Sequence, residues 1–600
     1  MRMRVSLGPV FTFESLIAVR RWQVYALRSL YVTLLLVGLM LTWGPSEQTI
    51  TDVAQAAEIG RILLLTVIAV QLGVVLLAAP AATAGAVCVD KARGTLLHAF
   101  TTDLTAREII LGKLGARLGP VVGLMACGLP VLALGSFLGG IDLVAALGAE
   151  LVTLGVAVVC CSVALLASVW ARKPHQALLL AYTMVGAWAG AIPSAIFVFG
   201  MGPPTSLGQM TLFLTNPIVA AFAPEMSTPG LPVGLREQGV FLAGSLLVSM
   251  LLLGLASWTL RPAVLAQANR PQKRVPTATP ARLVDFIPGP PLDANPILWR
   301  EWHRKRPSLW TGRFWTAYAI VSSLASLYVI GLYYTWWGDG LIRSGIHLVA
   351  ARINAWQVAI GLLLLSVSAA SALGEERDRG SLDVIMTTTL TSREIVWGKW
   401  WGTFALVPRL AILPIWVTAG AAMITGNGLG LLFMIGLILA YAAAITSVGL
   451  ALATWVPRLG RVIGISVMGY ILVAAGWPLI LTLLPNLPSF QGVPVYNQPN
   501  WQGLLLASPF YGVYATTDWA ARWSFGGDYS AGWGFGRAAI SEPTWPLIWI
   551  VFYAGFALLL ATATWKSFDR CMGRIPESRP DGATAPWRVP ESRPDGATAL

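Results

Sequence analysis

Long apolar runs separated by short polar segments dominate the hydropathy pattern of this chain. A helix needs about 20 residues to cross the roughly 30 Å of hydrocarbon in a bilayer. Runs of about that length fall near 27–45, 61–89, 114–139, 143–171, 176–200 and 239–262. A second set falls near 314–337, 345–374, 400–425, 428–456, 460–484 and 544–566. The pattern predicts an all-α polytopic integral membrane protein with about 12 transmembrane helices.

The composition and the placement of charge support a membrane protein. The chain is 56% hydrophobic and 12% charged, whereas soluble domains carry about 25% charged residues, so soluble and disordered classes are excluded. With the N-terminus inside and twelve crossings, all but six of the 41 Lys and Arg lie on one side of the membrane, the positive-inside pattern. We therefore expect a multi-pass protein of a prokaryotic plasma membrane with both termini cytoplasmic, and not a nucleic-acid-binding protein. The six exceptions are Arg61, Arg236, Arg343, Arg352, Arg522 and Arg537.

Three polar segments divide the chain. A Pro-rich, basic linker at 263–293 separates a first half, 1–262, from a second half, 294–566. A long outer loop rich in Trp and Gly is expected at 485–543. Residues 567–600 contain a tandem repeat that begins at Ile575 and again at Val589, and their polar, Pro-rich composition predicts a disordered cytoplasmic tail.

A 24-residue segment between the second and third runs of each half is repeated. Residues 90–113 and 376–399 align without a gap and share 12 identities. In each copy apolar residues recur at helical spacing, which predicts a short helix with one apolar stripe. Each copy then has a Thr-x-x-Glu capping box, at Thr105 and at Thr391, which restarts a helix toward the next span. The segments are therefore predicted to be helical hairpins with charged bases, in two homologous six-helix halves.

One hairpin alone would be equally well explained as a solvated connector with interfacial charges. Two matched copies favour a function. The sequence here resembles the coupling-helix region of ABC-2-type permeases, through acidic-x-x-Arg-Gly-Thr/Ser-Leu followed by Thr-Thr-x-Leu-Thr-x-Arg-Glu-Ile and Gly-Lys. Residues 295–301 resemble the interfacial helix of that family, and residues 9–14 share its Pro and Glu at the same separation.

The outer loop before the last span of each half also resembles the family. Asn216-Pro217 and Ser508-Pro509 each combine an N-cap residue with Pro at the first helical position. The resemblance implies a short re-entrant helical element at both places. The length of the second outer loop departs from the simplest family members.

The resemblance implies a permease subunit of an ATP-driven exporter, coupled through its hairpins to two copies of a separate cytoplasmic ATPase. No phosphate-binding Gly-x-x-x-x-Gly-Lys-Ser/Thr motif occurs, so we expect ATP hydrolysis on the partner and no enzyme activity, cofactor or metal in this chain. The bilayer is the other partner. The implied coupling residues are Arg93, Gly94, Leu96, Phe100, Arg107, Glu108, Lys113, Arg379, Gly380, Leu382, Met386, Arg393, Glu394 and Lys399.

Glu150 is a candidate intramembrane polar site. It lies eight residues past Asp142, about 12 Å along the fourth span, and intramembrane carboxylates are often functional. The repeat places Gly436 opposite it, so a carboxylate satisfied between helices is the alternative. A secondary transporter or channel built from repeats is the alternative function, and a membrane enzyme ranks third. The sequence leaves the substrate open, with apolar spans favouring a hydrophobic or amphipathic one.

Overall fold

The structure, a computed structural model, shows a multi-pass α-helical membrane protein. It describes residues 8–20, 22–43, 53–137, 143–171, 174–199, 214–222, 234–268, 290–293, 295–303, 309–335, 346–378, 380–478, 481, 501–522 and 544–573. Within these ranges every regular element is a helix. Ten helical segments are long and apolar enough to span a membrane. They are Leu63–Lys91, Ala106–Ala133, Leu143–Trp170, Leu235–Ala266, Trp315–Thr335, Ile346–Arg377, Ser392–Thr425, Gly428–Trp455, Leu459–Gly476 and Thr544–Met572.

The first part of the chain forms eleven of the labelled helices in the described residues. They are α1 (Pro9–Val19), α2 (Trp22–Trp43), α3 (Val53–Thr83), α4 (Cys88–Arg93), α5 (Thr95–Ala99), α6 (Ala106–Ala126), α7 (Leu129–Phe137), α8 (Leu143–Trp170), α9 (Pro174–Phe199), α11 (Pro217–Phe222) and α12 (Leu235–Ala268). Helices α2 and α9 lie where the first and fifth spans are predicted, but neither is among the ten. The total of twelve spans therefore stays a prediction.

The second part repeats much of this order. It comprises α13 (Pro296–His303), α14 (Leu309–Thr335), α16 (Ile346–Asp378), α17 (Ser381–Met386), α18 (Ser392–Phe404), α19 (Val407–Thr425), α20 (Gly428–Trp455), α21 (Leu459–Ile471) with the π-helical turn η2 (Leu472–Gly476), α23 (Trp501–Leu505), α24 (Pro509–Arg522) and α25 (Thr544–Met572).

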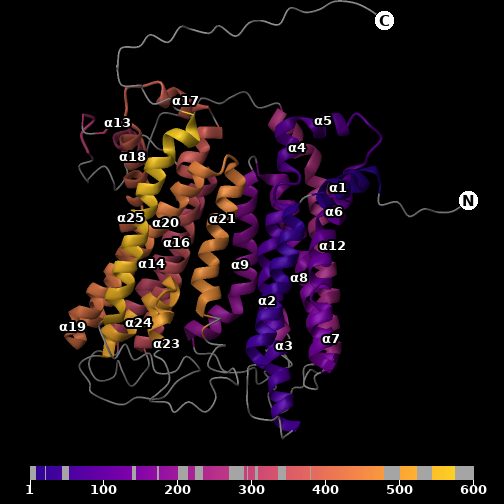
Figure 1. The fold of residues 1–600 in the computed structure, drawn as a ribbon, viewed down its shortest axis with the longest axis horizontal. Coiled ribbons are helices and arrows are strands. Elements are labelled where there is room, and N and C mark those ends of the chain that lie inside the picture. The colour runs from indigo at the N-terminus through magenta and orange to yellow at the C-terminus, as the bar shows by residue number, and fades with distance from the viewer. Residues whose placement is uncertain are drawn as a thin grey trace, which may run out of the picture.

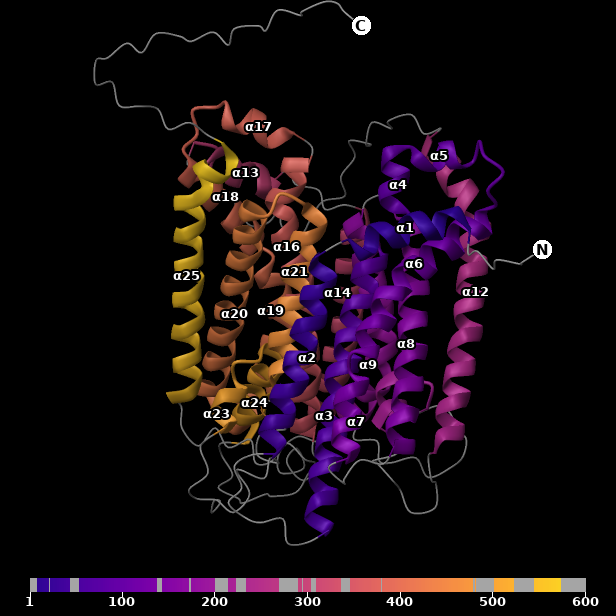
Figure 2. The same ribbon diagram turned by 45° about the vertical axis from the view of Figure 1, so that its right-hand side comes forward.

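The helices of the two parts gather on opposite sides of the molecule (Figure 1). Between them α9 packs against α16 and α21, and Leu178 of α9 lies against Gly464 of α21. The short helices α1, α4 and α5 lie at the same end of the molecule as α13 and α17, and α7, α23 and α24 lie at the other end (Figures 1 and 2). Each repeated hairpin therefore stands beside the short helix that precedes its own group of spans.

Small residues let the central helices pack closely. In α8, Gly155 lies against Ser245 and Phe241 of α12, and a Cβ at that position would lie 3.0 Å from the Ser245 hydroxyl oxygen. In α20, a Cβ at Gly449 would lie 2.6 Å from the Cβ of Ala369 in α16. Lipid tails are as apolar as the helices, so close van der Waals contact rather than the hydrophobic effect favours such packing.

Two helices extend beyond the predicted domain boundaries. Helix α12 continues to Ala268 rather than ending near 262, and α25 continues to Met572 rather than giving way to a tail at 567. The extension of α25 is packed, because Phe568 is completely buried and Asp569 accepts a hydrogen bond from the Ser392 hydroxyl of α18. The outer loop at 485–543 contains α23 and α24. Loop residues 485–500 and 523–543, linker residues 269–289 and tail residues 574–600 lie outside the described residues.

Candidate functional site: two braced hairpins

Both hairpins turn at a left-handed glycine. Gly94 separates α4 from α5 with φ of 74°, and Gly380 precedes α17 with φ of 69°. An L-residue with a side chain adopts this conformation at a cost of about 1–2 kcal/mol, whereas glycine adopts it freely. The repeated Arg-Gly dipeptide of the sequence is thus the point where each hairpin bends.

Both predicted capping boxes are confirmed. The Thr105 hydroxyl accepts a hydrogen bond from the Glu108 backbone N–H at 3.3 Å, and the Glu108 carboxylate accepts one from the Thr105 N–H at 2.9 Å. Thr391 and Glu394 make the same pair of bonds at 3.3 and 2.8 Å. Each box satisfies N–H groups at the first turn of α6 or α18, so the return arm of each hairpin begins at a defined residue.

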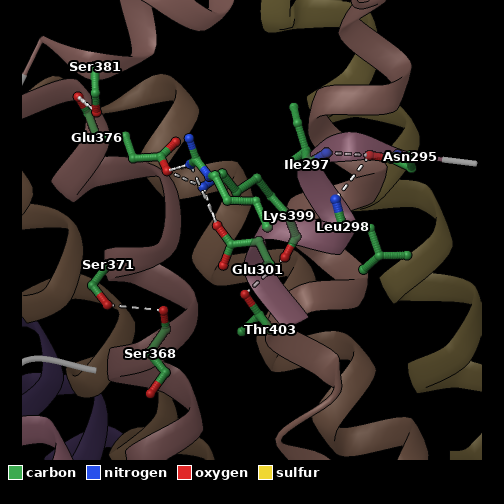
Figure 3. A network of polar contacts seen from close by, with 11 residues as sticks. Asn295, Ile297, Leu298, Glu301, Ser368, Ser371, Glu376, Ser381, Lys399 and Thr403 are labelled. Carbon is green, nitrogen blue, oxygen red and sulfur yellow. Dashed lines mark hydrogen bonds and ion pairs between the residues drawn. The ribbon is translucent and has the colours of Figure 1, made fainter. Parts of the chain in front are cut away.

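A buried lysine joins three helices at the base of the second hairpin. Lys399 of α18 is completely buried, and its Nζ donates to Glu301 Oε1 of α13 at 2.5 Å and lies 2.6 Å from Glu376 Oε1 of α16. Arg300 of α13 also bonds to the Glu376 carboxylate. Figure 3 shows the Lys399 side chain directed at the two carboxylates. Residues almost 100 positions apart along the chain are thereby held together.

The first hairpin has the same arrangement. Lys113 of α6 is only 3% exposed, and its Nζ donates to Glu14 Oε1 of α1 at 2.7 Å and to Asp90 Oδ2 of α4 at 2.5 Å. Arg117 donates to the other Glu14 oxygen at 2.8 Å. Each lysine thus pairs with one carboxylate from the short helix and one from the outgoing arm of the hairpin. We call these two clusters the charge braces; they are Glu14, Asp90 and Lys113, and Glu301, Glu376 and Lys399.

In each half, a glycine at the same repeat position lets the short helix, α1 or α13, pack closely against α6 or α18. A Cβ at Gly112 would lie 3.1 Å from the Val10 Cβ of α1, and a Cβ at Gly398 would lie 3.1 Å from the Ile297 Cβ of α13. Asn295 adds a link in the second half, because its Nδ2 donates to the Glu394 carbonyl at 3.0 Å while its Oδ1 caps the start of α13. The Gly-Lys pair of each repeat therefore serves helix packing and charge pairing, with the lysine directed away from solvent.

A second cation ties each hairpin to the fourth predicted span. Lys91 Nζ donates to the Val169 and Ala171 carbonyls, both at 2.6 Å, at the end of α8. The equivalent Arg377 donates to the Thr454 carbonyl at 3.5 Å, at the end of α20. A cation at a helix C-terminus satisfies open carbonyls and interacts favourably with the helix dipole. The hairpin bases are thus joined to several spans at once.

The other residues of the predicted coupling set divide into buried and exposed groups. Leu96 and Leu382 are 2% and 1% exposed and pack into the core of the protein itself, so their role is internal packing. Arg93, Arg107 and Arg393 are exposed, and Phe100 and Met386 are half-buried. Arg379 lies outside the described residues.

The two most exposed apolar side chains of the short hairpin helices are not among the implied coupling residues. Leu97 of α5 is 43% exposed and Val384 of α17 is 67% exposed. Leu97 follows Leu96 directly in the chain, but only Leu96 faces inward. No local pattern shows which flank of so short a helix meets the membrane domain.

Glu150 has hydrogen-bonded neighbours. Its Oε2 accepts a bond from Gln71 Nε2 at 2.8 Å, and Gln71 Oε1 accepts one from the Tyr31 hydroxyl at 2.7 Å. The matching Gln357 of the second half instead donates to the Ser326 hydroxyl at 2.9 Å. A carboxylate satisfied between α2, α3 and α8 accounts for this geometry, and a transport role for Glu150 stays a prediction.

At the opposite end of each half, the residue before a short helix donates a side-chain hydrogen bond to a neighbouring helix. Asn216, before α11, donates to the Ala189 carbonyl of α9 at 2.9 Å, and Ser508, before α24, donates to the Ala474 carbonyl of η2 at 2.6 Å. The predicted N-cap-Pro helices are thus present, each bonded to the fifth predicted span of its half.

In comparisons with known proteins, no family model and no curated protein matches this chain.

Proposed function

We propose that this protein is the membrane-spanning permease subunit of an ATP-driven ABC transporter that works as an exporter. Two six-span halves with twelve spans in total would form one transport unit in the plasma membrane, with both termini and both hairpins in the cytoplasm. Two copies of a separate ATPase subunit would bind the hairpins. The resemblance of the repeated hairpin to the coupling region of ABC-2-type permeases supports this proposal.

The observation that carries the proposal is the charge brace in both halves. A solvated connector needs no buried lysine, since taking charges out of water costs several kcal/mol per ion before the pairing compensates it. Here both hairpins contain such a lysine, and both lysines join the hairpin to a short flanking helix. A hairpin held in this way moves together with its spans, so a partner that displaces it can shift the half as a rigid body.

The exposed flank of each hairpin supplies the docking surface in this proposal. Leu97 and Val384 are apolar side chains that the membrane domain leaves uncovered, and Arg93, Arg107 and Arg393 lie exposed on the same two hairpins. Apolar anchors within a charged rim are typical of protein interfaces. Leu96 and Leu382 are buried and pack each hairpin against the rest of the protein.

The test is co-purification of an ATPase from native membranes with affinity-tagged full-length chain. Hot-spot substitutions cost about 2 kcal/mol or more, roughly a thirtyfold loss of affinity, so Leu97→Asp and Val384→Asp should each deplete the ATPase from the preparation. Leu292→Asp is the matched control, because Leu292 is 53% exposed just before α13 and outside the hairpin. Absence of any ATPase from the wild-type preparation, or equal recovery with all three variants, would contradict the proposal.

A further inference from the structure

Glu150 is a carboxylate inside a span of the first half, and its hydrogen-bond partner is neutral. It lies in α8, seven residues after the helix begins at Leu143, about 10 Å along the helix. Among the described residues, the one hydrogen bond to this carboxylate comes from the Gln71 amide at 2.8 Å. The Tyr31 hydroxyl in turn donates to Gln71 Oε1 at 2.7 Å. An amide supplies a hydrogen bond but no charge, and carboxylates within spans commonly pair with a cation or mark a substrate pathway.

The second half shows that the fold does not require this carboxylate. In the registers that the two charge braces set, the matched pairs are Tyr31 with Tyr318, Gln71 with Gln357, and Glu150 with Gly436. The tyrosine and the glutamine are therefore common to both halves, and the carboxylate is present in the first half only. A Cβ at Gly436 would lie 2.7 Å from the Ile550 Cδ1 of α25. The matching helices α14, α16 and α20 form without the carboxylate, so packing alone does not explain it.

The face of α8 that carries Glu150 is left partly uncovered. Helix α8 is the most buried of the ten spans that the structure describes, yet Leu143 and Leu147 are 59% and 49% exposed, and Glu150 is half-buried. Residues three and four apart lie on the same face of a helix, so two leucines lead along one stripe to the carboxylate. Helices α2 and α3, which carry Tyr31 and Gln71, lie toward the second group of helices, whereas α12 lies on the far side (Figures 1 and 2).

We propose that Glu150 binds the positively charged group of a lipophilic cation, while Leu143 and Leu147 contact its apolar part. Opposite charges attract more strongly where water is scarce and the dielectric constant is low. A cation within about 4–6 Å also favours the ionised form of a carboxylate. Because the repeat position holds a carboxylate in the first half only, we expect a single bound cation per chain. That this cation is the transported cargo rests on the proposed function, whereas the binding itself does not.

Equilibrium dialysis of radiolabelled tetraphenylphosphonium against detergent-purified full-length chain tests the proposal, with protein-free micelles subtracted. Loss of a charged partner weakens binding about tenfold or more, so Glu150→Gln should bind at least that much more weakly than the wild type. Glu150→Asp keeps the charge and should bind more tightly than Glu150→Gln. Leu147→Ala should weaken binding severalfold through lost apolar contact. Glu237→Gln is the matched control and should bind like the wild type, because Glu237 of α12 is a half-buried carboxylate of the same half that accepts a hydrogen bond from the Gly234 N–H at 2.8 Å.

Two further probes separate charge from shape. Tetraphenylborate has nearly the shape of tetraphenylphosphonium but a negative charge, and it should not bind. Tetramethylammonium has the charge without the apolar surface, and it should compete only at far higher concentration. Size-exclusion profiles like that of the wild type would show that each variant is folded. No binding of tetraphenylphosphonium by the wild type, equal affinity of the wild type and Glu150→Gln, equal binding of tetraphenylborate, or equal competition by tetramethylammonium would each overturn the proposal. No ATPase takes part in this measurement, so its failure and the failure of the proposed function are separate results.

Discussion

Replacing Lys399 with methionine should open the second hairpin far more than the same change at Lys113 opens the first. The Glu301 side chain is 2% exposed and would stay buried without its lysine. Removal of one partner from a buried ion pair costs about 3–5 kcal/mol. Arg300 compensates only in part, because its side chain is 40% exposed and its Nη2 lies 4.0 Å from Glu301 Oε1, whereas the Lys399 Nζ lies at 2.5 Å.

The first charge brace is better protected against this change. Without Lys113, Glu14 keeps Arg117 at 2.8 Å, and Asp90, with a side chain 28% exposed, can turn to water. The expected loss is that of a hydrogen bond to a charged group, about 1.5–3 kcal/mol. The two lysines are equivalent in the repeat, so the difference arises only from their surroundings.

Amide hydrogen exchange of the purified protein measures this loss as local opening. A cost of about 3–5 kcal/mol should speed exchange in α13 and α17 by roughly 150-fold or more for Lys399→Met. A cost of about 1.5–3 kcal/mol should speed exchange in α1 and α5 by roughly 12-fold to 150-fold for Lys113→Met. Arg107→Met, at an exposed residue of the first hairpin, should leave exchange unchanged. Lys399→Met combined with Glu301→Gln should recover much of the protection, because the buried carboxylate that loses the Lys399 ammonium is then replaced by a neutral amide. Exchange in α13 within twofold of wild type for Lys399→Met alone would refute the reasoning.

Five further substitutions, of three kinds, test the hairpins and the helix α13 beside the second one. Gly94→Ala and Gly380→Ala should each cost about 1–2 kcal/mol through the left-handed φ, seen as faster exchange in α5 or α17; unchanged exchange would mean that the turn relaxes freely. Thr105→Ala and Thr391→Ala should each cost about 1 kcal/mol by removing a capping box, measured as fraying in the first turn of α6 or α18, and protection equal to wild type there would argue against the caps. Asn295→Ala removes a cap of α13 together with its bond to the Glu394 carbonyl. Protease cleavage near α13 should therefore be severalfold faster than in the wild type, while cleavage near α1 keeps its wild-type rate. An equal change in the two cleavage rates would contradict this role.

Features that depend on neighbours in the chain were predictable from sequence. The apolar runs locate the ten spans that the structure describes, because a helix across hydrocarbon must be apolar throughout its length. The capping boxes at Thr105 and Thr391 were predictable for the same reason, since their partners lie three residues away. The Arg-Gly dipeptide recurs in both copies, and in both the glycine has the left-handed φ that glycine adopts without strain. The gapless repeat indicated that both hairpins have the same local structure.

Features that depend on distant residues needed the tertiary structure. Lys113 and Lys399 belong to the predicted coupling surface by motif, yet both are buried, because carboxylates from α1 and α13 approach from about 100 residues away along the chain. Helix α25 extends beyond its apolar run because Phe568 packs against other helices and Asp569 accepts a hydrogen bond from Ser392 of α18. The spacing of Leu96 and Leu97 permits either to face inward, and packing against α6, α8 and α12 buries Leu96 and leaves Leu97 exposed. Periodicity describes the face of a helix, whereas burial depends on what the rest of the chain places against that face.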